Sequence, residues 1–342
     1  MGVTIADRPY LDIGGSRKDP DEEFNAAQPF LAATELSDGT VVVSDYARLV
    51  FFSKDGKYLR SAGHAGSGPG EFSQLRETCL LAGDSILAID YSSGRLSKWD
   101  ASGRHIATFP RPGSVPLGAC FPNGDVVVRS STVGGAGPDN RQASEYRIVG
   151  FDGVTRRSLG LMPGPTYAGP MAWDVYVKPL GQRLAFANSR NFEVTIYDTV
   201  GRPRRIVRVE AAAGSISDAA WQSHLEAMIP NNTPEPQRAA MLARVMSMKK
   251  PEVYPALRDM LIRNNAQMWI QDYADPARWI IFDALGSLVG RFDIPQALRS
   301  QGAQLKGVAL DHVVMLWRDG DGAAHLTFYR IAPASTGGNA GM

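Results

Sequence analysis

The chain has 342 residues, of which 44% are hydrophobic and 21% charged, and its 36 basic and 35 acidic side chains leave a net charge of +1. This is the composition of an ordinary globular protein, without the clustered positive charge that binds nucleic acid or an anionic membrane, so we expect no nucleic-acid partner. It has no apolar run of 18 residues, and we therefore expect no transmembrane segment.

The N-terminal residues, MGVTIADRPYLDIGG, lead directly into a strand expected at 8–15. They contain neither a positively charged segment nor an apolar core, so they do not read as a signal peptide. One hypothesis is that the protein is secreted or periplasmic after removal of a leader that this chain does not contain. A cytoplasmic location is the alternative.

A unit with an aromatic residue before a turn recurs along the chain. The aromatic anchors are Phe52, Trp99, Phe151, Tyr197, Phe282 and Phe328. Successive anchors are 47, 52, 46, 85 and 46 residues apart, which indicates a period near 47 with one insertion of about 38 residues. A period of this length is typical of β-propeller blades.

Each unit contains the strands of one blade. An apolar strand ends in a turn such as Asp38-Gly39 or Asn123-Gly124, and a β-branched run such as TVVVSD or DVVVRS follows. These runs are apolar at consecutive positions, which indicates sheets covered on both faces. The aromatic strand and a more polar strand come next. Four antiparallel strands, the outermost being the most solvated, make up a propeller blade.

Six anchors predict six blades, but the last unit ends after LTFYRI without a fourth strand. The strand expected at 8–15 can supply it, and a ring closed in this way leaves no unpaired edge. We therefore predict an all-β fold, a six-bladed β-propeller closed by an N-terminal strand. Residues 1–334 would form it as a single domain, and 335–342 would be a flexible tail.

A glycine-rich stretch, SAGHAGSGPGEFSQL at 61–75, follows the first blade. It resembles the connection between blades in NHL repeats, which has the form G-x-x-G-x-G-P-G-x-F. The matching residues are Gly66, Gly68, Pro69, Gly70 and Phe72. Glycines permit the positive φ needed where the outer strand returns to the axis, and we expect Phe72 to fill the space between blades. The resemblance is closest over residues 24–110 and points to six-bladed NHL-like propellers.

Lyases and lactonases of six-bladed propellers hold a metal in the central channel with His, or with Glu, Asn and Asp, from several inner strands. The histidines of this chain are His64, His105, His224, His312 and His325. None falls in the middle of an expected inner strand, so no His-held metal and no cofactor are predicted. A Ca²⁺ site stays open, because hard cations need only carboxylates, amides and carbonyls.

Three expected corners repeat an Asp-Tyr pair with a nearby Arg. They are Asp45-Tyr46 with Arg48, Asp90-Tyr91 with Arg95, and Asp272-Tyr273 with Arg278. A structural explanation is that each Asp binds the backbone of its corner and pairs with the Arg. A functional explanation is that the three sets hold a polar ligand.

Polar residues at the start of the inner strands are further candidates, because they border the axial mouth where a concave site is expected. Together with the corner tyrosines, the residues expected to bind a ligand are Tyr46, Arg76, Glu77, Tyr91, Trp173, Asp174, Tyr254, Arg258, Tyr273 and Lys306.

The insertion, at about 214–250 between blades four and five, changes to a helical pattern. In its first half Ser217 is a candidate cap, before an apolar stripe of Trp221, Leu225 and Met228. In its second half Thr233 is the expected N-cap and Pro234 the first helical residue, before an apolar face of Met241, Leu242, Val245 and Met246. We expect a helical hairpin that covers the axial mouth as a lid or docking surface. Decoration of the rim is the alternative.

The two cysteines, Cys79 and Cys120, fall in successive inner strands at different offsets from their turns. We therefore expect them to be unlinked.

Three functions are compatible with this fold, because propellers serve many purposes. The leading hypothesis is a monomeric recognition propeller that binds a protein partner or small ligand on the top face at the central channel. The alternative is a channel enzyme, a lyase or hydrolase such as a lactonase, that uses a carboxylate-bound divalent cation. A structural scaffold within a larger envelope complex is the third.

Overall fold

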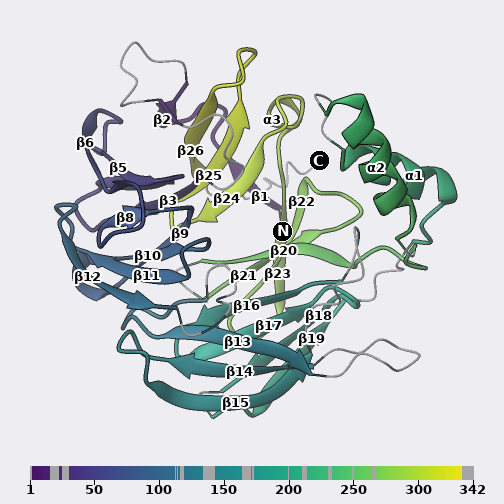
Figure 1. The fold of residues 1–342 in the computed structure, drawn as a ribbon, viewed down its shortest axis with the longest axis horizontal. Coiled ribbons are helices and arrows are strands. Elements are labelled where there is room, and N and C mark those ends of the chain that lie inside the picture. Colours follow the sequence, from purple (N-terminus) through teal and green to yellow (C-terminus); the bar gives the residue numbers. More distant parts are fainter. Residues whose placement is uncertain are drawn as a thin grey trace, which may run out of the picture.

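In a computed structural model of the chain, six small sheets follow one another in sequence order around a common axis (Figure 1). The structure describes residues 2–15, 23–24, 31–111, 113, 115, 119–133, 143–163, 171, 173–198, 200–209, 214–229, 233–248, 250–263 and 266–332. The tail predicted at 335–342 lies outside these residues. Within them, the fold is the predicted six-bladed β-propeller.

Each blade is an antiparallel sheet whose first strand lies nearest the axis. Blade one consists of β3 (Ala32–Glu35), β4 (Val41–Asp45), β5 (Arg48–Phe52) and β6 (Tyr58–Ala62). Blade two consists of β9 (Leu75–Leu80), β10 (Ile86–Asp90), β11 (Arg95–Trp99) and β12 (His105–Pro110), with the short η1 (Ala82–Asp84) between its first two strands. Blade three consists of β13 (Val126–Val133), β14 (Ala143–Val149) and β15 (Thr155–Pro163), and an isolated bridge between Cys120 and Val126 stands at its inner position.

The second half of the ring repeats this arrangement. Blade four consists of β16 (Val175–Leu180), β17 (Arg183–Asn188), β18 (Glu193–Tyr197) and β19 (Pro203–Arg208). Blade five consists of β20 (Leu257–Ile262), β21 (Met268–Asp272), β22 (Arg278–Phe282) and β23 (Leu288–Asp293). Blade six consists of β24 (Gln304–Val308), β25 (His312–Arg318) and β26 (Ala324–Ala332), and the one-turn α3 (Gln296–Arg299) precedes it. We call the face where inner strands begin the top face and the opposite one the bottom face.

The core lies between neighbouring blades. One cluster joins Val42 and Phe51 of blade one to Ile86 and Ala88 of blade two, and similar clusters occupy the other junctions around the ring. A second strand such as β4 is therefore buried along its whole length. This accounts for the apolar residues at consecutive positions, since both faces of each sheet are covered.

The N-terminal strand closes the ring as predicted. β2 (Leu11–Gly14) pairs with β26 from Leu11 opposite Phe328 to Gly14 opposite His325, and so supplies the fourth strand of blade six. β1 (Gly2–Ile5), which the sequence did not predict, pairs antiparallel with β26 and parallel with β23. The N-terminal segment thus joins blades five and six as well as completing the latter.

The glycine-rich stretch forms the connection expected of it. β7 (His64–Ala65) and β8 (Glu71–Phe72) pair in parallel across it. Phe72 is 1% exposed, belongs to the core cluster between blades one and two, and stacks on Trp99 with ring centroids 5.5 Å apart. Gly63 has φ of +76°, and a β-carbon there would lie 2.5 Å from the Phe72 ring. A side chain at this position would displace the ring that fills the junction.

The insertion is a helical hairpin of α1 (Asp218–Ala227) and α2 (Glu235–Met246). Ser217 caps α1 as predicted, because its side chain accepts a hydrogen bond from the amide of Ala220. The predicted N-cap at Thr233 is wrong by one residue: Pro234, with ψ of 144°, is extended and occupies the cap position of α2. No helix in the described part of the chain is long and apolar enough to cross a membrane.

The hairpin has a small core of its own, formed by Ile216, Trp221, Leu225, Ile229 and Val245. Only part of each predicted stripe is buried, and the exposed members are Met228, Met241 and Met246. In Figure 1 the hairpin projects at the edge of the ring and does not cross the inner strands at its centre. Its predicted position over the axial mouth is therefore not confirmed, and it lies to one side.

Cys79 and Cys120 form a disulfide, so the prediction that they are unlinked is wrong. Their Cα atoms are 6.4 Å apart, within the range that a disulfide spans. The prediction compared offsets along each strand. Inner strands of neighbouring blades converge near the axis, and the short distance between them there brings the two residues together despite the different offsets.

Candidate functional site

The corner of blade two supports the structural explanation of the Asp-Tyr pairs. The carboxylate of Asp90 accepts hydrogen bonds from the backbone amides of Ser73, Gln74 and Ser93 at 2.7, 3.1 and 3.1 Å. Burial raises the pKa of Asp90, but these hydrogen bonds outweigh it and the pKa lies below its ordinary value. Asp90 thus ties its own corner to the connection from blade one.

The arginine of that corner also donates hydrogen bonds to the backbone. Arg95 donates to the carbonyl oxygens of Ser67, Gly68 and Glu71 at 2.5, 3.0 and 3.3 Å, and so holds the glycine-rich connection. The expected Asp–Arg pairing is seen in the other corners, with distances of 3.0 Å between Asp45 and Arg48 and 3.7 Å between Asp272 and Arg278.

The tyrosine of blade two is held inside the structure. The guanidinium carbons of Arg76 and Arg111 each lie 4.6 Å from the centre of the Tyr91 ring, and the hydroxyl donates to the carbonyl oxygen of Val115 at 2.5 Å. Burial, followed by the charge of Glu77, raises the pKa of the Tyr91 phenol. The structure therefore brings the predicted residues Arg76, Glu77 and Tyr91 together in one cluster, in which the phenol of Tyr91 is neutral.

Blade four places Trp173 and Asp174 at the top of its inner strand. Arg190 lies over the Trp173 ring at 4.6 Å from its centre. The backbone of Asp174 exchanges hydrogen bonds with Ser189, and its carboxylate accepts from the amide of Val175 at 2.7 Å. Tyr46, in the corner of blade one, is 38% exposed and has φ of +50°, and it stands apart from the other groups.

Blade five presents its aromatic group at the top face. Arg258 is exposed and lies 4.8 Å from the centre of the Tyr273 ring, and the Tyr254 ring is 5.7 Å from the Tyr273 ring. Burial raises the pKa of the Tyr273 phenol, and the charge of Arg258 opposes this. Tyr254 also packs against the small core of the hairpin, and its amide donates to Gly214. The base of the hairpin thus supports this aromatic pair.

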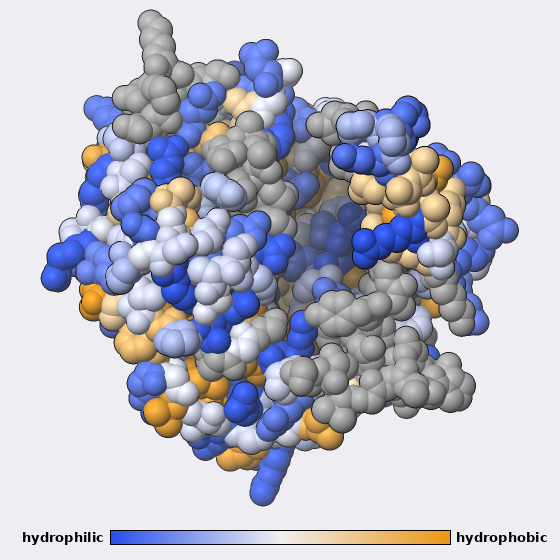
Figure 2. Space-filling view, viewed as in Figure 1, coloured by the Kyte–Doolittle hydropathy of each residue, from blue (hydrophilic) through white to orange (hydrophobic). Residues whose placement is uncertain are grey.

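Beside this group lies a cavity of about 430 Å³ between blades five and six, which we call the blade 5–6 pocket. Its polar lining includes Arg258, Asp259, Gln271, Gln304 and Lys306. On the face shown in Figure 2, the surface is hollowed next to the hairpin, and the floor of the hollow is hydrophilic. Among the ten predicted residues, Arg258 and Lys306 line this pocket, with Tyr273 and Tyr254 stacked beside Arg258.

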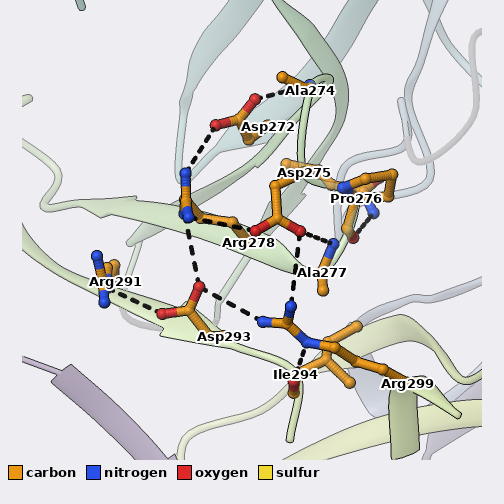
Figure 3. A network of polar contacts seen from close by, with 11 residues as sticks. Asp272, Ala274, Asp275, Pro276, Ala277, Arg278, Arg291, Asp293, Ile294 and Arg299 are labelled. Atoms are coloured by element: carbon orange, nitrogen blue, oxygen red, sulfur yellow. Dashed lines mark hydrogen bonds and ion pairs between the residues drawn. The ribbon is translucent and has the colours of Figure 1, made fainter. Parts of the chain in front are cut away.

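An ion-pair network stiffens one wall of the pocket (Figure 3). Arg278 lies between Asp272, Asp275 and Asp293 at 3.7, 3.2 and 3.5 Å. Arg299 of α3 reaches Asp275 and Asp293 at 3.8 and 3.7 Å and donates to the carbonyl oxygen of Ile294 at 2.6 Å. Asp275 and Arg299 also line the pocket, so the network holds the connection from blade five to blade six in place.

Three polar residues in the interior of inner strands were missed from the sequence: Tyr176, Lys178 and Asp259. Burial raises the pKa of the Asp259 carboxyl, whereas Lys178 and Lys306 act to lower it. Burial lowers the pKa of Lys306, and Asp259 opposes that change. The pKa of Tyr176 is raised by burial and then by Asp174. The sequence offered one signal for these three residues. A polar side chain in the middle of an otherwise apolar inner strand is expected to face the channel.

Side chains that commonly bind metal ions are dispersed among the described residues. Within them, no three His, Cys, Asp or Glu side chains gather closely enough to hold a metal ion. His312 and His325 instead contact carboxylates of Glu35, Asp12 and Asp319 in strands of blades one and six.

Similarity to known proteins supports the fold. The model of the DUF5128 family, described as a 6-bladed beta-propeller, matches residues 34–115, which span blades one and two. No curated protein is significantly similar to the chain.

Solved structures match nearly the whole chain. A candidate exported protein of Bacteroides fragilis is 12% identical with a TM-score of 0.55, and the match covers 97% of this chain and 96% of that one. A DUF4221 family member from Bacteroides vulgatus is 9% identical with a TM-score of 0.56, over 97% and 99%. A gluconolactonase of Xanthomonas campestris is 12% identical over 96% and 97%, with a TM-score of 0.43. At these identities the similarity shows a propeller fold and nothing further.

Proposed function

We propose that the protein is a recognition propeller that binds a small polar ligand in the blade 5–6 pocket, on the top face beside the hairpin. The observation that carries the proposal is the convergence of charged and amide side chains on this one pocket. Arg258 and Lys306 offer cationic donors, Gln271 and Gln304 offer amides, and Asp259 offers a carboxyl group. Ligand pockets combine a few convergent polar groups in this way.

The lining favours a hydroxylated carboxylate, such as a sugar acid. A carboxylate would pair with Arg258 or Lys306, because charge-assisted hydrogen bonds are the stronger ones. Ligand hydroxyls would exchange hydrogen bonds with the two glutamine amides. The Tyr254 and Tyr273 rings, 5.7 Å apart, lie beside the pocket and would hold the guanidinium of Arg258 in place for the carboxylate.

We further propose that the protein works outside the reducing cytoplasm, as a secreted or periplasmic protein. The disulfide between Cys79 and Cys120 supports this, because disulfides persist in oxidising compartments. The NHL-like character of residues 24–110 and the single domain over 1–334 belong to the same proposal. A monomer is the expected state, since the clasp covers the edge of β26 in blade six.

Binding of galacturonate, with galactose as the matched neutral sugar, tests the proposed function. Isothermal titration should detect galacturonate binding to the wild-type protein and weaker or no binding of galactose. Arg258→Ala should weaken galacturonate binding about tenfold or more, which is the loss expected for one charge-assisted contact. Arg204→Ala is the control, because Arg204 is exposed and pairs with Asp198 at the outer edge of blade four.

The proposal fails if gluconate, glucuronate and galacturonate all leave the wild-type protein unbound. It also fails if Arg258→Ala and Arg204→Ala bind galacturonate equally well. Thermal unfolding of each variant, followed by circular dichroism, checks that the propeller is intact.

A further inference from the structure

A second and larger cavity occupies the axis toward the bottom face. It measures about 830 Å³, within the usual range for small-molecule sites. Residues from all six blades line it, one from each being Ala33, Thr78, Cys120, Lys178, Ile262 and Val308. We call it the axial cavity. Among the described residues, Lys306 is the one polar residue that lines both the axial cavity and the blade 5–6 pocket. Lys306 therefore marks the inner end of the axial cavity.

The inner end of the axial cavity carries positive charge. Lys178 is the fourth residue of β16, and Lys306 is the third residue of β24. Asp259 lies on β20, the inner strand between them, and both lysines act to lower its pKa. Asp259 is their shared carboxylate, and its raised pKa reduces the negative charge that it can offer. In the described part of the chain, neither lysine makes an ion pair within 4.0 Å. Two partly buried ammonium groups thus share one carboxylate, that of Asp259.

Hydroxyl groups stand on another part of the same wall. The Oγ1 atoms of Thr34 and Thr78 are 3.0 Å apart, so one hydroxyl donates to the other and the second can donate to a further acceptor. Glu77 lines the cavity too, but it lies beside Tyr91, whose pKa it raises, on the blade two side. Thr34, Thr78 and Glu77 thus belong to blades one and two, whereas the two lysines belong to blades four and six.

Apolar side chains line part of the outer end of the axial cavity. Leu80, Pro179, Leu261, Ile262 and Val308 line it where the inner strands end at the bottom face. A hydrocarbon or aromatic group that covers these side chains removes apolar area from water. This favours its binding by about 25 cal/mol per Å² of apolar area buried.

Charged groups at the rim are already engaged. His312 lies 3.4 Å from Glu35 and 2.8 Å from Asp311, and burial lowers the pKa of its imidazole. Arg263 donates to the carbonyl oxygen of Ala309 at 2.7 Å. Asp84 accepts a hydrogen bond from the amide of Ser37 at 3.0 Å. A charged group of a ligand would therefore find fewer available partners at the rim than at the two lysines inside.

We propose that the axial cavity binds a monocarboxylate with an apolar body, which enters from the bottom face. The carboxylate lies between Lys178 and Lys306, and the apolar body contacts Ile262, Val308 and their neighbours. This site shares only Lys306 with the lining of the blade 5–6 pocket, and its ligand is an amphiphile in place of a sugar acid.

Calorimetric titration with three probes of equal chain length tests the proposal on the wild-type protein. Octanoate should bind, and 1-octanol and octylammonium should bind at least about tenfold more weakly, because they lack the carboxylate. Lys178→Met should weaken octanoate binding about tenfold or more and leave galacturonate binding unchanged. Lys98→Met on β11, outside the cavity, is the control.

A charge placed at the apolar end provides an independent variant. Ile262→Glu should weaken octanoate binding about tenfold or more while both lysines stay in place. The proposal is overturned if octanoate does not bind the wild-type protein, or if 1-octanol binds as tightly. It is also overturned if Lys178→Met and Ile262→Glu, shown to be folded by circular dichroism, bind octanoate like Lys98→Met. Failure of galacturonate to bind has no bearing on these outcomes.

Discussion

Blades two and five carry the same Asp-Tyr corner, yet they use it differently. In blade two, Asp90 accepts three backbone hydrogen bonds and the Tyr91 ring is enclosed between Arg76 and Arg111. In blade five, Asp272 accepts one backbone hydrogen bond, from Ala274, and shares Arg278 with two other carboxylates.

The connections that reach each corner explain the difference. The glycine-rich connection before blade two brings backbone amides and carbonyls onto the corner, where Asp90 and Arg95 bind them. Blade five is preceded by the hairpin insertion, and Tyr273 packs against Tyr254 at its base. A repeated motif thus sets where a side chain stands, and the connection decides whether that side chain is left for a ligand.

Removal of the N-terminal clasp should have the largest effect, and it acts at blades five and six, with which β1 and β2 pair. Deletion of residues 1–14 removes β1 and β2, and with them the buried side chains of Ile5, Leu11 and Ile13. We expect the free energy of unfolding to fall by about 5 kcal/mol or more, from lost burial alone. Urea unfolding followed by circular dichroism measures it. An unchanged unfolding midpoint would contradict the closure of the ring by this segment.

Alanine at the two corner aspartates sharpens the comparison directly. Asp90→Ala leaves three amides without their acceptor and should cost about 3 kcal/mol. Asp272→Ala removes one backbone hydrogen bond and a partly exposed ion pair, and should cost about 1 kcal/mol. Urea unfolding of the two variants gives both values. Equal costs would show that the corners are used in the same way.

The same difference should appear as a pH dependence. Because the pKa of Asp90 is lowered in the folded protein, its contribution to stability is present above its ordinary pKa of 3.8 and is lost as the pH falls through the folded value. Asp90→Asn should therefore lose less stability than the wild-type protein when the pH is lowered below about 4. Unfolding midpoints measured across this range test the sign. Parallel curves for the two proteins would rule out this role.

Replacement of the hairpin should have the smallest effect on the fold. A short Gly/Ser linker in place of residues 214–250 removes a core that is largely separate from the blades, and changes in loop length cost stability only slowly. The propeller should stay folded, as judged by circular dichroism, while galacturonate binding weakens because Tyr254 loses its support. Loss of folding would mean that the hairpin belongs to the core, and unaltered binding would mean that it is decoration.

The regular part of the fold could be predicted because its signals are local. The aromatic anchors located the blades, and the strand expected at 8–15 corresponds to β2 in the clasp. The glycine pattern placed Phe72 between two blades. β1 was missed because its four residues, of which only Ile5 is buried, carry no clear period, and its pairing with β23 depends on the closed ring.

Part of the site could be predicted, again because its signals are local. Arg258 and Lys306 were found because they stand near the start of inner strands. Lys178 and Asp259 were missed, since period alone does not tell which side of a strand faces the channel. The disulfide between Cys79 and Cys120 depends on the distance between neighbouring blades at the axis, and that distance is set by the closure of the whole ring.

Leucine in place of each corner tyrosine tests the central claim most directly. Tyr273→Leu should weaken galacturonate binding about tenfold, because Arg258 of the blade 5–6 pocket loses the ring against which it lies, with little change in stability. Tyr91→Leu should lower stability, since it removes the hydroxyl bound to Val115 and the ring between two arginines, and should leave binding unchanged. Calorimetric titration of both variants with galacturonate, beside urea unfolding, separates the two effects. Equal loss of binding in the two variants, or loss only in Tyr91→Leu, would contradict the assignment of the ligand to blade five.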